Sequence, residues 1–130
     1  MEIKNNRKRI LAIDDEPVIS RVSLRVLKSD GFEVDIAGNG LVAKEMTGKT
    51  DYDLYLCDIR MPEMNGMEFY EYLRQVHPGC ETRVIFVSGD TMNNEVRTFL
   101  SGKKNLFLVK PFTPEELRAV IQKALKQRDK

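Results

Sequence analysis

The sequence predicts an α/β fold, a three-layer sandwich in which helices cover both faces of a parallel five-stranded sheet. Three observations lead to this prediction. Short apolar runs recur five times, segments with helical periodicity lie between them, and the pattern fits into 130 residues, a length that suits one domain with one core. Strands that alternate with helices at such short spacing need right-handed crossovers, so neighbouring strands run parallel.

Five short apolar runs have the length and composition of strands. They occupy residues 10–13, 34–37, 54–57, 84–87 and 106–109. Four of them are nearly continuous, as expected of strands that helices cover on both faces. In the second run, Glu33 and Asp35 alternate with apolar residues, which is typical of an edge strand with one wetter face. Cys57, in the third run, is expected to be a buried thiol that packs as a small hydrophobic side chain.

Helical periodicity fills the intervals between these runs. The segments cover residues 17–29, 40–47, 66–76 and 93–101, and a last one begins at residue 114. Pro17 and Pro114 suit the first turn of a helix, where the missing N–H is not needed. Thr113 and Glu116 have the spacing of a capping box ahead of the last segment. An apolar stripe over residues 117–125 follows that box.

The order of the elements predicts where the chemistry lies. A (βα)5 chain of this kind favours the flavodoxin-like strand order 2-1-3-4-5, whose switch point lies between the first and third strands. Asp14 and Asp15 follow the first strand and Asp58 follows the third, so we expect three carboxylates in one crevice. Carboxylates this close raise each other's pKa unless a cation neutralises them, and Mg²⁺ prefers such oxygen ligands. The alternative, that Asp14 or Asp15 only caps the helix from Pro17, is less favoured with a third acid opposite.

The fourth and fifth strands end in further polar groups. Ser88 and Gly89 offer a hydroxyl and an unobstructed backbone N–H, a combination that alone indicates only a turn. Lys110 precedes Pro111, so its backbone is restricted to non-helical geometry and the bond between them can be cis. Its ammonium group would face the acidic cluster, where its charge has partners.

Together these strand ends predict phosphoryl transfer to a carboxylate. Asp58 would be the nucleophile, and Asp14 and Asp15 would hold Mg²⁺. The remaining phosphoryl oxygens would be stabilised by four groups: the side chains of Lys110 and Ser88, and the backbone N–H groups near Arg60 and Gly89. Such reactions depend mainly on positioning and electrostatics.

With these residues in place, the chain resembles the receiver domain of bacterial two-component response regulators, over about residues 9–125. The matching residues are Asp14, Asp15, Asp58, Ile59, Arg60, Met61, Pro62, Asn65, Gly66, Ser88, Lys110, Pro111 and Phe112. The resemblance implies transfer to Asp58 from a phosphohistidine of a sensor histidine kinase or a phosphotransfer protein. It also implies a requirement for Mg²⁺, with Mn²⁺ as a substitute, a metal contact from the backbone carbonyl of Arg60, and a cis Lys110–Pro111 bond.

The resemblance also implies a route for the output signal. In this family the signal leaves through the face of the fourth helix, fifth strand and fifth helix, and the switch residues here would be Ser88 and Phe107. Serine replaces the commoner threonine, and Phe107 lacks the hydroxyl of tyrosine, so a plain core role for Phe107 stays open. Arg60 and Asp90 flank the phosphoryl site at positions that influence dephosphorylation in the family. The alternative for Arg60 is a solvated surface side chain.

The donor and the readout are expected to lie outside this chain. The only histidine, His77, precedes Pro78 near a helix end and is expected to be an ordinary surface residue. We expect one domain over residues 1–130 with short basic tails, and a signalling module that promotes its own phosphorylation and dephosphorylation but is not an enzyme. Its expected reader is a protein target or an attached output domain, and a homodimer linked to phosphorylation is compatible with the family. A single-domain regulator, a longer regulator and a hybrid sensor kinase all stay open as contexts.

Composition excludes some classes of partner. The net charge of +1 gives no strong field for nucleic acid or an anionic membrane. No apolar run is long enough to span a bilayer, and the start lacks a signal-peptide core, so we expect a cytoplasmic protein without membrane insertion or direct nucleic acid binding. Two alternative functions remain: a constitutive interaction module that is never phosphorylated, and an aspartate-nucleophile phosphatase. The latter commonly has Asp-x-Asp at the nucleophile, which the sequence from Asp58 to Arg60 lacks.

Overall fold

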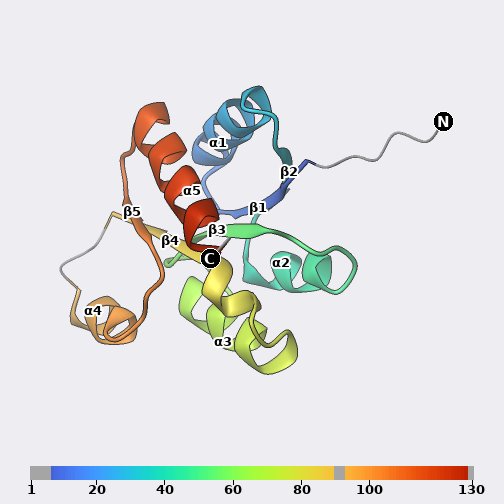
Figure 1. The fold of residues 1–130 in the computed structure, drawn as a ribbon. Helices are drawn as coiled ribbons and strands as arrows, with labels where there is room; N and C mark the ends of the chain where they lie inside the picture. The colour runs from blue at the N-terminus through green and yellow to red at the C-terminus, as the bar shows by residue number, and fades with distance from the viewer. Residues whose placement is uncertain (1–6, 90–92, 129–130) are drawn as a thin grey trace.

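A computed structural model describes residues 7–89 and 93–128 of the chain (Figure 1). Five strands alternate with five helices, as the sequence predicts. The strands are β1 (Arg9–Ile13), β2 (Glu33–Ala37), β3 (Leu54–Asp58), β4 (Val84–Ser88) and β5 (Phe107–Val109). The helices are α1 (Pro17–Ser29), α2 (Gly40–Thr47), α3 (Gly66–Val76), α4 (Asn94–Leu100) and α5 (Pro114–Arg128). A short 3-10 helix, η1 (Cys80–Arg83), precedes β4 and was not predicted.

The strands form one parallel sheet in the order β2-β1-β3-β4-β5. This confirms the predicted order and places the ends of β1 and β3 next to each other. The prediction of a wetter β2 is also confirmed, because Asp35 is exposed between half-buried neighbours. The prediction that β5 is covered on both faces is wrong. β5 is a three-residue edge strand, and Val109 is 50% exposed.

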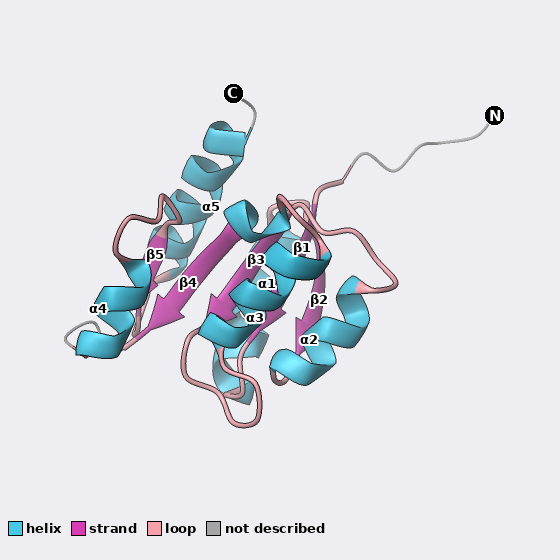
Figure 2. Cartoon of the chain, turned by 90° about the horizontal axis from the view of Figure 1, so that it is seen from below, coloured by secondary structure: helices cyan, strands magenta, loops and turns pink. Residues whose placement is uncertain are grey.

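Helices cover both faces of the sheet (Figures 1 and 2). On one face, α1 and α5 pack an aliphatic cluster whose members include Leu27, Leu54, Leu117 and Ile121. On the other face, α2, α3 and α4 pack a cluster that is richer in aromatic side chains, with Phe69 at its centre. The two layers bury all of β3 and β4, so the strand ends that carry polar side chains are held by a fixed core.

The predicted helix signals are found at the predicted residues. Pro17 lies in the first turn of α1. The capping box before α5 is present, since the N–H of Thr113 donates to Glu116 Oε1 at 2.9 Å and the N–H of Glu116 donates to Thr113 Oγ1 at 3.1 Å. The fourth helix is one residue shorter at each end than predicted. At its start, the side chain of Asn93 caps the helix by accepting the N–H groups of Glu95 and Val96.

Two further sequence-based expectations can be compared with the structure. Cys57 is fully buried in β3, as predicted. Within residues 7–89 and 93–128, no helix is both long enough and apolar enough to cross a membrane.

Candidate functional site

Asp58 is the last residue of β3 and lies at the carboxyl edge of the sheet. It is only 5% exposed. The chain stays in register with β4 just past it, because the N–H of Ile59 donates to the carbonyl of Val87 at 3.0 Å. The polar side chain therefore stands at the point where the buried strand gives way to a loop.

Gly66 allows the loop after β3 to pack closely against the backbone of Asp58 and Ile59. A Cβ atom at Gly66 would lie 2.5 Å from the carbonyl oxygen of Asp58 and 2.9 Å from the Cα of Ile59, so only glycine fits here. The N–H of Gly66 donates to the carbonyl of Ile59 at 2.9 Å. A capping box between Asn65 and Glu68 then starts α3. The first turn of α3 is thereby packed directly against the backbone of Asp58.

The acids after β1 lie beside Asp58. Asp14 is buried, and its Oδ1 accepts the N–H of Glu16 at 2.8 Å, while Asp15 and Glu16 are exposed. Carboxylate oxygens of Asp14, Asp15, Glu16 and Asp58 all lie within 4.8 Å of one another. The N-cap residue of α1 is Glu16, which makes no side-chain capping bond, so neither Asp14 nor Asp15 is the cap of this helix.

Lys110 joins these acids. Its Nζ lies 2.8 Å from Asp58 Oδ2, 2.9 Å from Asp14 Oδ2 and 2.7 Å from Glu16 Oε1. The backbone holds Lys110 at this edge, because its N–H donates to the carbonyl of Ser88 at 3.1 Å and its bond to Pro111 is cis. Glu16 was not assigned a role from the sequence, although its position directly after Asp14 and Asp15 was a usable signal.

The protonation of the site reflects this crowding. Burial raises the pKa of the Asp58 carboxyl above its usual range, and the charge of Asp14 adds to the shift, although the hydrogen bond from Lys110 opposes it. Burial alone would lower the pKa of Lys110. Hydrogen bonds from its ammonium group to Asp58, Glu16 and Asp14 outweigh burial and raise that pKa. Lys110 is therefore a permanent cation that is shared by three carboxylates.

A backbone N–H and an ammonium group both donate to the Asp58 carboxylate. The N–H of Arg60 donates to Asp58 Oδ1 at 3.2 Å, so both carboxylate oxygens accept a hydrogen bond. Ser88 ends β4 and is buried, and Gly89 next to it is exposed. Arg60 itself is an exposed residue. Asp90, which was expected to flank the phosphoryl site together with Arg60, lies outside the described residues.

Phe107 belongs to β5, the edge strand next to β4. It is half-buried at the start of β5, where it pairs in register with Phe86 of β4 and packs against the cluster under α3 and α4. This contact agrees with a core role and also places the ring on the side of the sheet that α4 covers.

The residues present fit a hard divalent cation. Three sequence-predicted carboxylates converge at one strand edge, and their oxygens are the donors that Mg²⁺ selects. With Lys110 they form a compact site in which one oxygen of the Asp58 carboxylate accepts from the Lys110 ammonium group and the other from the backbone N–H of Arg60. That arrangement can bind and orient a phosphoryl group.

Comparison with known proteins points in the same direction. The sequence model of the response regulator receiver domain matches residues 10–122. The chain is similar to ycf29 of Porphyra purpurea, named a probable transcriptional regulator, with 34% identity over 114 residues that cover 87% of this chain and 54% of that protein. It is similar to the sensor kinase CckA of Brucella abortus, with 31% identity over 122 residues that cover 92% of this chain and 13% of that protein.

One solved structure with the same fold is a complex with Mg²⁺ and BeF. The response regulator TrrA from Thermotoga maritima, in complex with Mg²⁺ and BeF, superposes with a TM-score of 0.76 at 29% identity, covering 90% of this chain and 98% of that one. The chain thus matches nearly the whole of the TrrA structure, but spans about half the length of ycf29 and a small part of CckA.

Proposed function

The chain belongs to the response regulator receiver domain family, and from that premise we propose that Asp58 is the phosphoacceptor of a two-component phosphorelay. The observation that carries this proposal is the position of Lys110 Nζ, within 2.9 Å of both Asp14 and Asp58 at one sheet edge. A cation held this close to a buried carboxylate can also meet the oxygens of a phosphoryl group that the carboxylate accepts.

In the proposed reaction a carboxylate oxygen of Asp58 attacks the phosphorus of a phosphohistidine. The P–N bond breaks, the imidazole of the donor leaves with the bonding electrons and takes up a proton, and an acyl phosphate forms on Asp58. Lys110, the hydroxyl of Ser88 and the backbone N–H groups of Arg60 and Gly89 donate to the phosphoryl oxygens. Attack of water on that phosphorus later releases inorganic phosphate and restores the carboxylate.

We propose that Asp14, Asp15 and Asp58, with the backbone carbonyl of Arg60, would hold Mg²⁺, for which Mn²⁺ can substitute. The cation supplies positive charge that neutralises the phosphoryl oxygens and the clustered acids. The carboxylate oxygens within 4.8 Å support this assignment. The similar TrrA structure, which is a complex with Mg²⁺ and BeF, also supports it.

Incorporation of phosphate tests the acceptor. Acetyl phosphate with Mg²⁺ is expected to add one phosphoryl group to the native chain, seen by intact mass, and none to Asp58→Asn. The matched control is Asp53→Asn, because Asp53 lies at the opposite end of the same strand. Full labelling of Asp58→Asn would refute the assignment.

Mg²⁺ titration separates the proposal from an interaction module that is never phosphorylated. Calorimetry is expected to give saturable binding to the native chain and much weaker binding to Asp14→Asn. If the native chain bound no Mg²⁺, the never-phosphorylated module would become the better interpretation.

We further propose that phosphorylation is read through the face formed by α4, β5 and α5, with Ser88 and Phe107 as switch residues. The packing of Phe107 on the α4 side of the sheet supports this. Phe107→Ala is expected to change the affinity of the phosphorylated chain for its partner more than it changes the rate of phosphorylation. Equal partner binding by phosphorylated mutant and native chain would contradict it.

The proposed partners follow from the family and the relatives. The donor is a sensor histidine kinase or a phosphotransfer protein, and the reader is a separate protein or an attached output domain. We propose that residues 9–125 form one receiver domain in either case. The similarity to a sensor kinase supports the hybrid-kinase context as an alternative to a regulator.

A further inference from the structure

A second cavity lies at the amino edge of the sheet, opposite Asp58. This groove has a volume of about 820 Å³, within the range of sites that bind ligands. Its apolar lining includes Leu54, Val84 and Leu106, which lie at or just before the starts of β3, β4 and β5. The proposed phosphoryl chemistry at the carboxyl edge uses none of these residues.

Among the described residues that line this groove, four are cations and none is acidic. They come from three parts of the fold: Arg83 from η1, Lys103 and Lys104 from the loop before β5, and Arg128 from the end of α5. A cleft lined by charges of one sign concentrates ions of the opposite sign. The groove therefore favours an acidic occupant.

Two of these four cations have neutral partners. The Nη1 of Arg83 donates to the carbonyl of Tyr52 at 3.2 Å. The ammonium group of Lys103 donates to the carbonyl of Phe99 and lies 4.0 Å from the centre of its ring. These contacts fix the two cations in place without cancelling their charge.

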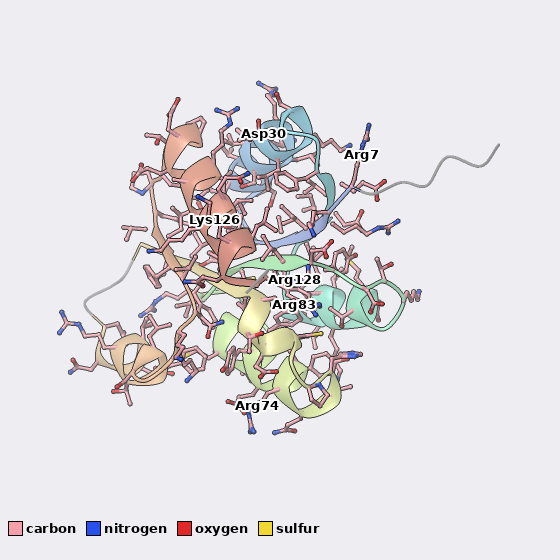
Figure 3. All side chains as sticks on the ribbon, viewed as in Figure 1. Arg7, Asp30, Arg74, Arg83, Lys126 and Arg128 are labelled. Carbon is pink, nitrogen blue, oxygen red and sulfur yellow. The ribbon has the colours of Figure 1, made fainter. Side chains whose placement is uncertain are left out.

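Arg128 alone among the four is paired with an acid, the Asp53 carboxylate. Arg83 binds the carbonyl of Tyr52 and Arg128 binds the carboxylate of the next residue, Asp53, so both guanidinium groups are anchored to the segment just before β3 (both residues are labelled in Figure 3). Lys104 is exposed. The groove thus holds three anchored cations, Arg83, Lys103 and Arg128, and one exposed lysine, Lys104.

The backbone around the groove argues against a phosphate site. Phosphate sites commonly use converging backbone N–H groups. Here the N–H of Gly79 donates to Glu81 Oε1 at 2.7 Å, and the N–H of Lys103 donates to the carbonyl of Leu100 at 3.1 Å. The cations are also spread over separate elements instead of surrounding one point. Carboxylates spaced along a chain match this arrangement better than a single phosphate.

We propose that this groove docks an acidic peptide segment of a partner protein, with apolar side chains on the groove floor and carboxylates facing Arg83, Lys103 and Lys104. Charge complementarity carries the choice of occupant, and the mixed apolar and basic lining explains why acidic and apolar residues are both needed. The site lies at the opposite end of the sheet from the phosphoryl acceptor and does not depend on it.

The first test uses a fluorescein-labelled synthetic peptide of alternating glutamate and leucine, measured by fluorescence anisotropy at low salt. Saturable binding to the native chain is expected, and roughly tenfold weaker binding to the double variant Arg83→Gln, Lys104→Gln. The charge-matched control is Arg25→Gln, Lys28→Gln, because both residues are exposed on α1. This control is expected to bind as the native chain does.

Four outcomes would overturn the proposal: no saturable binding, unchanged binding by the groove variant, equal binding of a peptide with glutamine in place of glutamate, or displacement by inorganic tripolyphosphate at concentrations that mark a phosphate site. A second test does not depend on the variants, because it compares the amide NMR shifts of the native chain with and without the peptide. Peptide-dependent shifts are expected at Gly79, Gly102 and Asn105, which line the groove. Shifts confined to the amides around Gly66 and Gly89 would contradict it.

Discussion

β3 has an aspartate at each end, and the two carboxylates are in opposite electrostatic situations. Asp53 directly precedes the strand. Although burial opposes it, the hydrogen bonds from Arg128 and from the backbone N–H of Arg9 lower the pKa of Asp53. Asp58 ends the strand, and burial with the nearby charge of Asp14 raises its pKa despite Lys110. One strand thus carries one carboxylate stabilised as an anion and one destabilised as an anion.

The difference lies in how cations are shared. At the amino edge the guanidinium of Arg128 pairs with Asp53, and that of Arg9 pairs with Glu33 at 3.1 Å. At the carboxyl edge the single ammonium group of Lys110 pairs with three acids. Exposed ion pairs such as those at the amino edge add little to stability, and in each of them the acid already has a counter-charge. The second arrangement leaves excess negative charge, which suits the proposed binding of a cation and a phosphoryl group.

Removing Lys110 should produce the largest effect. Lys110→Gln is expected to slow phosphorylation by acetyl phosphate on the order of a hundredfold, because the phosphoryl oxygens lose their charged donor. The measurement is the rate of acyl phosphate formation by intact mass. Lys103→Gln is the matched control, since Lys103 contacts Phe99 at the opposite edge. Equal rates in the two variants would show that the shared cation is not what distinguishes the carboxyl edge.

A methyl group at Gly66 should distort the same edge. Gly66→Ala places a Cβ 2.5 Å from the carbonyl oxygen of Asp58, so we expect the free energy of unfolding to fall by about 2 kcal/mol. Gly48→Ala, after α2 at the amino edge, meets only Glu45 at 3.4 Å and should change stability by less than about 0.5 kcal/mol. Urea denaturation of both variants measures the difference, and similar losses would contradict the packing argument.

The sequence alone was sufficient to predict that charged side chains converge at the carboxyl edge of the sheet. Parallel strands end at one edge, so once β1, β3 and β5 were recognised, Asp14, Asp58 and Lys110 had to lie near one another. Their contacts at 2.8 and 2.9 Å follow that expectation. The alternating apolar pattern also gave the wetter β2, because side-chain alternation is a local property.

Features that depend on tertiary geometry were not predicted. The contact of Glu16 with Lys110 depends on side-chain reach across two loops. The exposure of Val109 reflects the edge position of β5, which its apolar composition conceals. The groove at the amino edge brings Arg83 and Arg128 together from distant segments, and each looks like an isolated surface cation in the sequence.

Neutralising Asp58 should stabilise the fold. Its pKa is near 3.9 in an unfolded chain and raised in the folded one, so the native fold loses stability as pH rises through the folded pKa. Asp58→Asn removes this loss. We expect its free energy of unfolding at pH 7, without Mg²⁺, to exceed that of the native chain by about 1 kcal/mol. The gain should shrink as pH falls below the unfolded pKa, where Asp58 is protonated in both states.

Urea denaturation over a range of pH measures this gain. A destabilised Asp58→Asn would mean that the ion pair with Lys110 outweighs burial and the charge of Asp14. Adding Mg²⁺ should reduce the advantage of the variant, because the native chain would then gain stability by binding the cation. An advantage that did not respond to Mg²⁺ would separate the stability effect from the proposed metal site.

Asp53→Asn should show the opposite sign and the smallest effect. The pKa of Asp53 is lowered in the folded chain, so its carboxylate contributes stability above the unfolded pKa, and that contribution is lost as pH falls through the folded pKa. Because the pair with Arg128 is partly exposed, we expect a loss of only about 0.5 kcal/mol at pH 7, reduced by salt. A double-mutant cycle with Arg128→Gln isolates the pair. If Asp53→Asn stabilised the chain as Asp58→Asn should, the two ends of β3 would not differ in the way their contacts require.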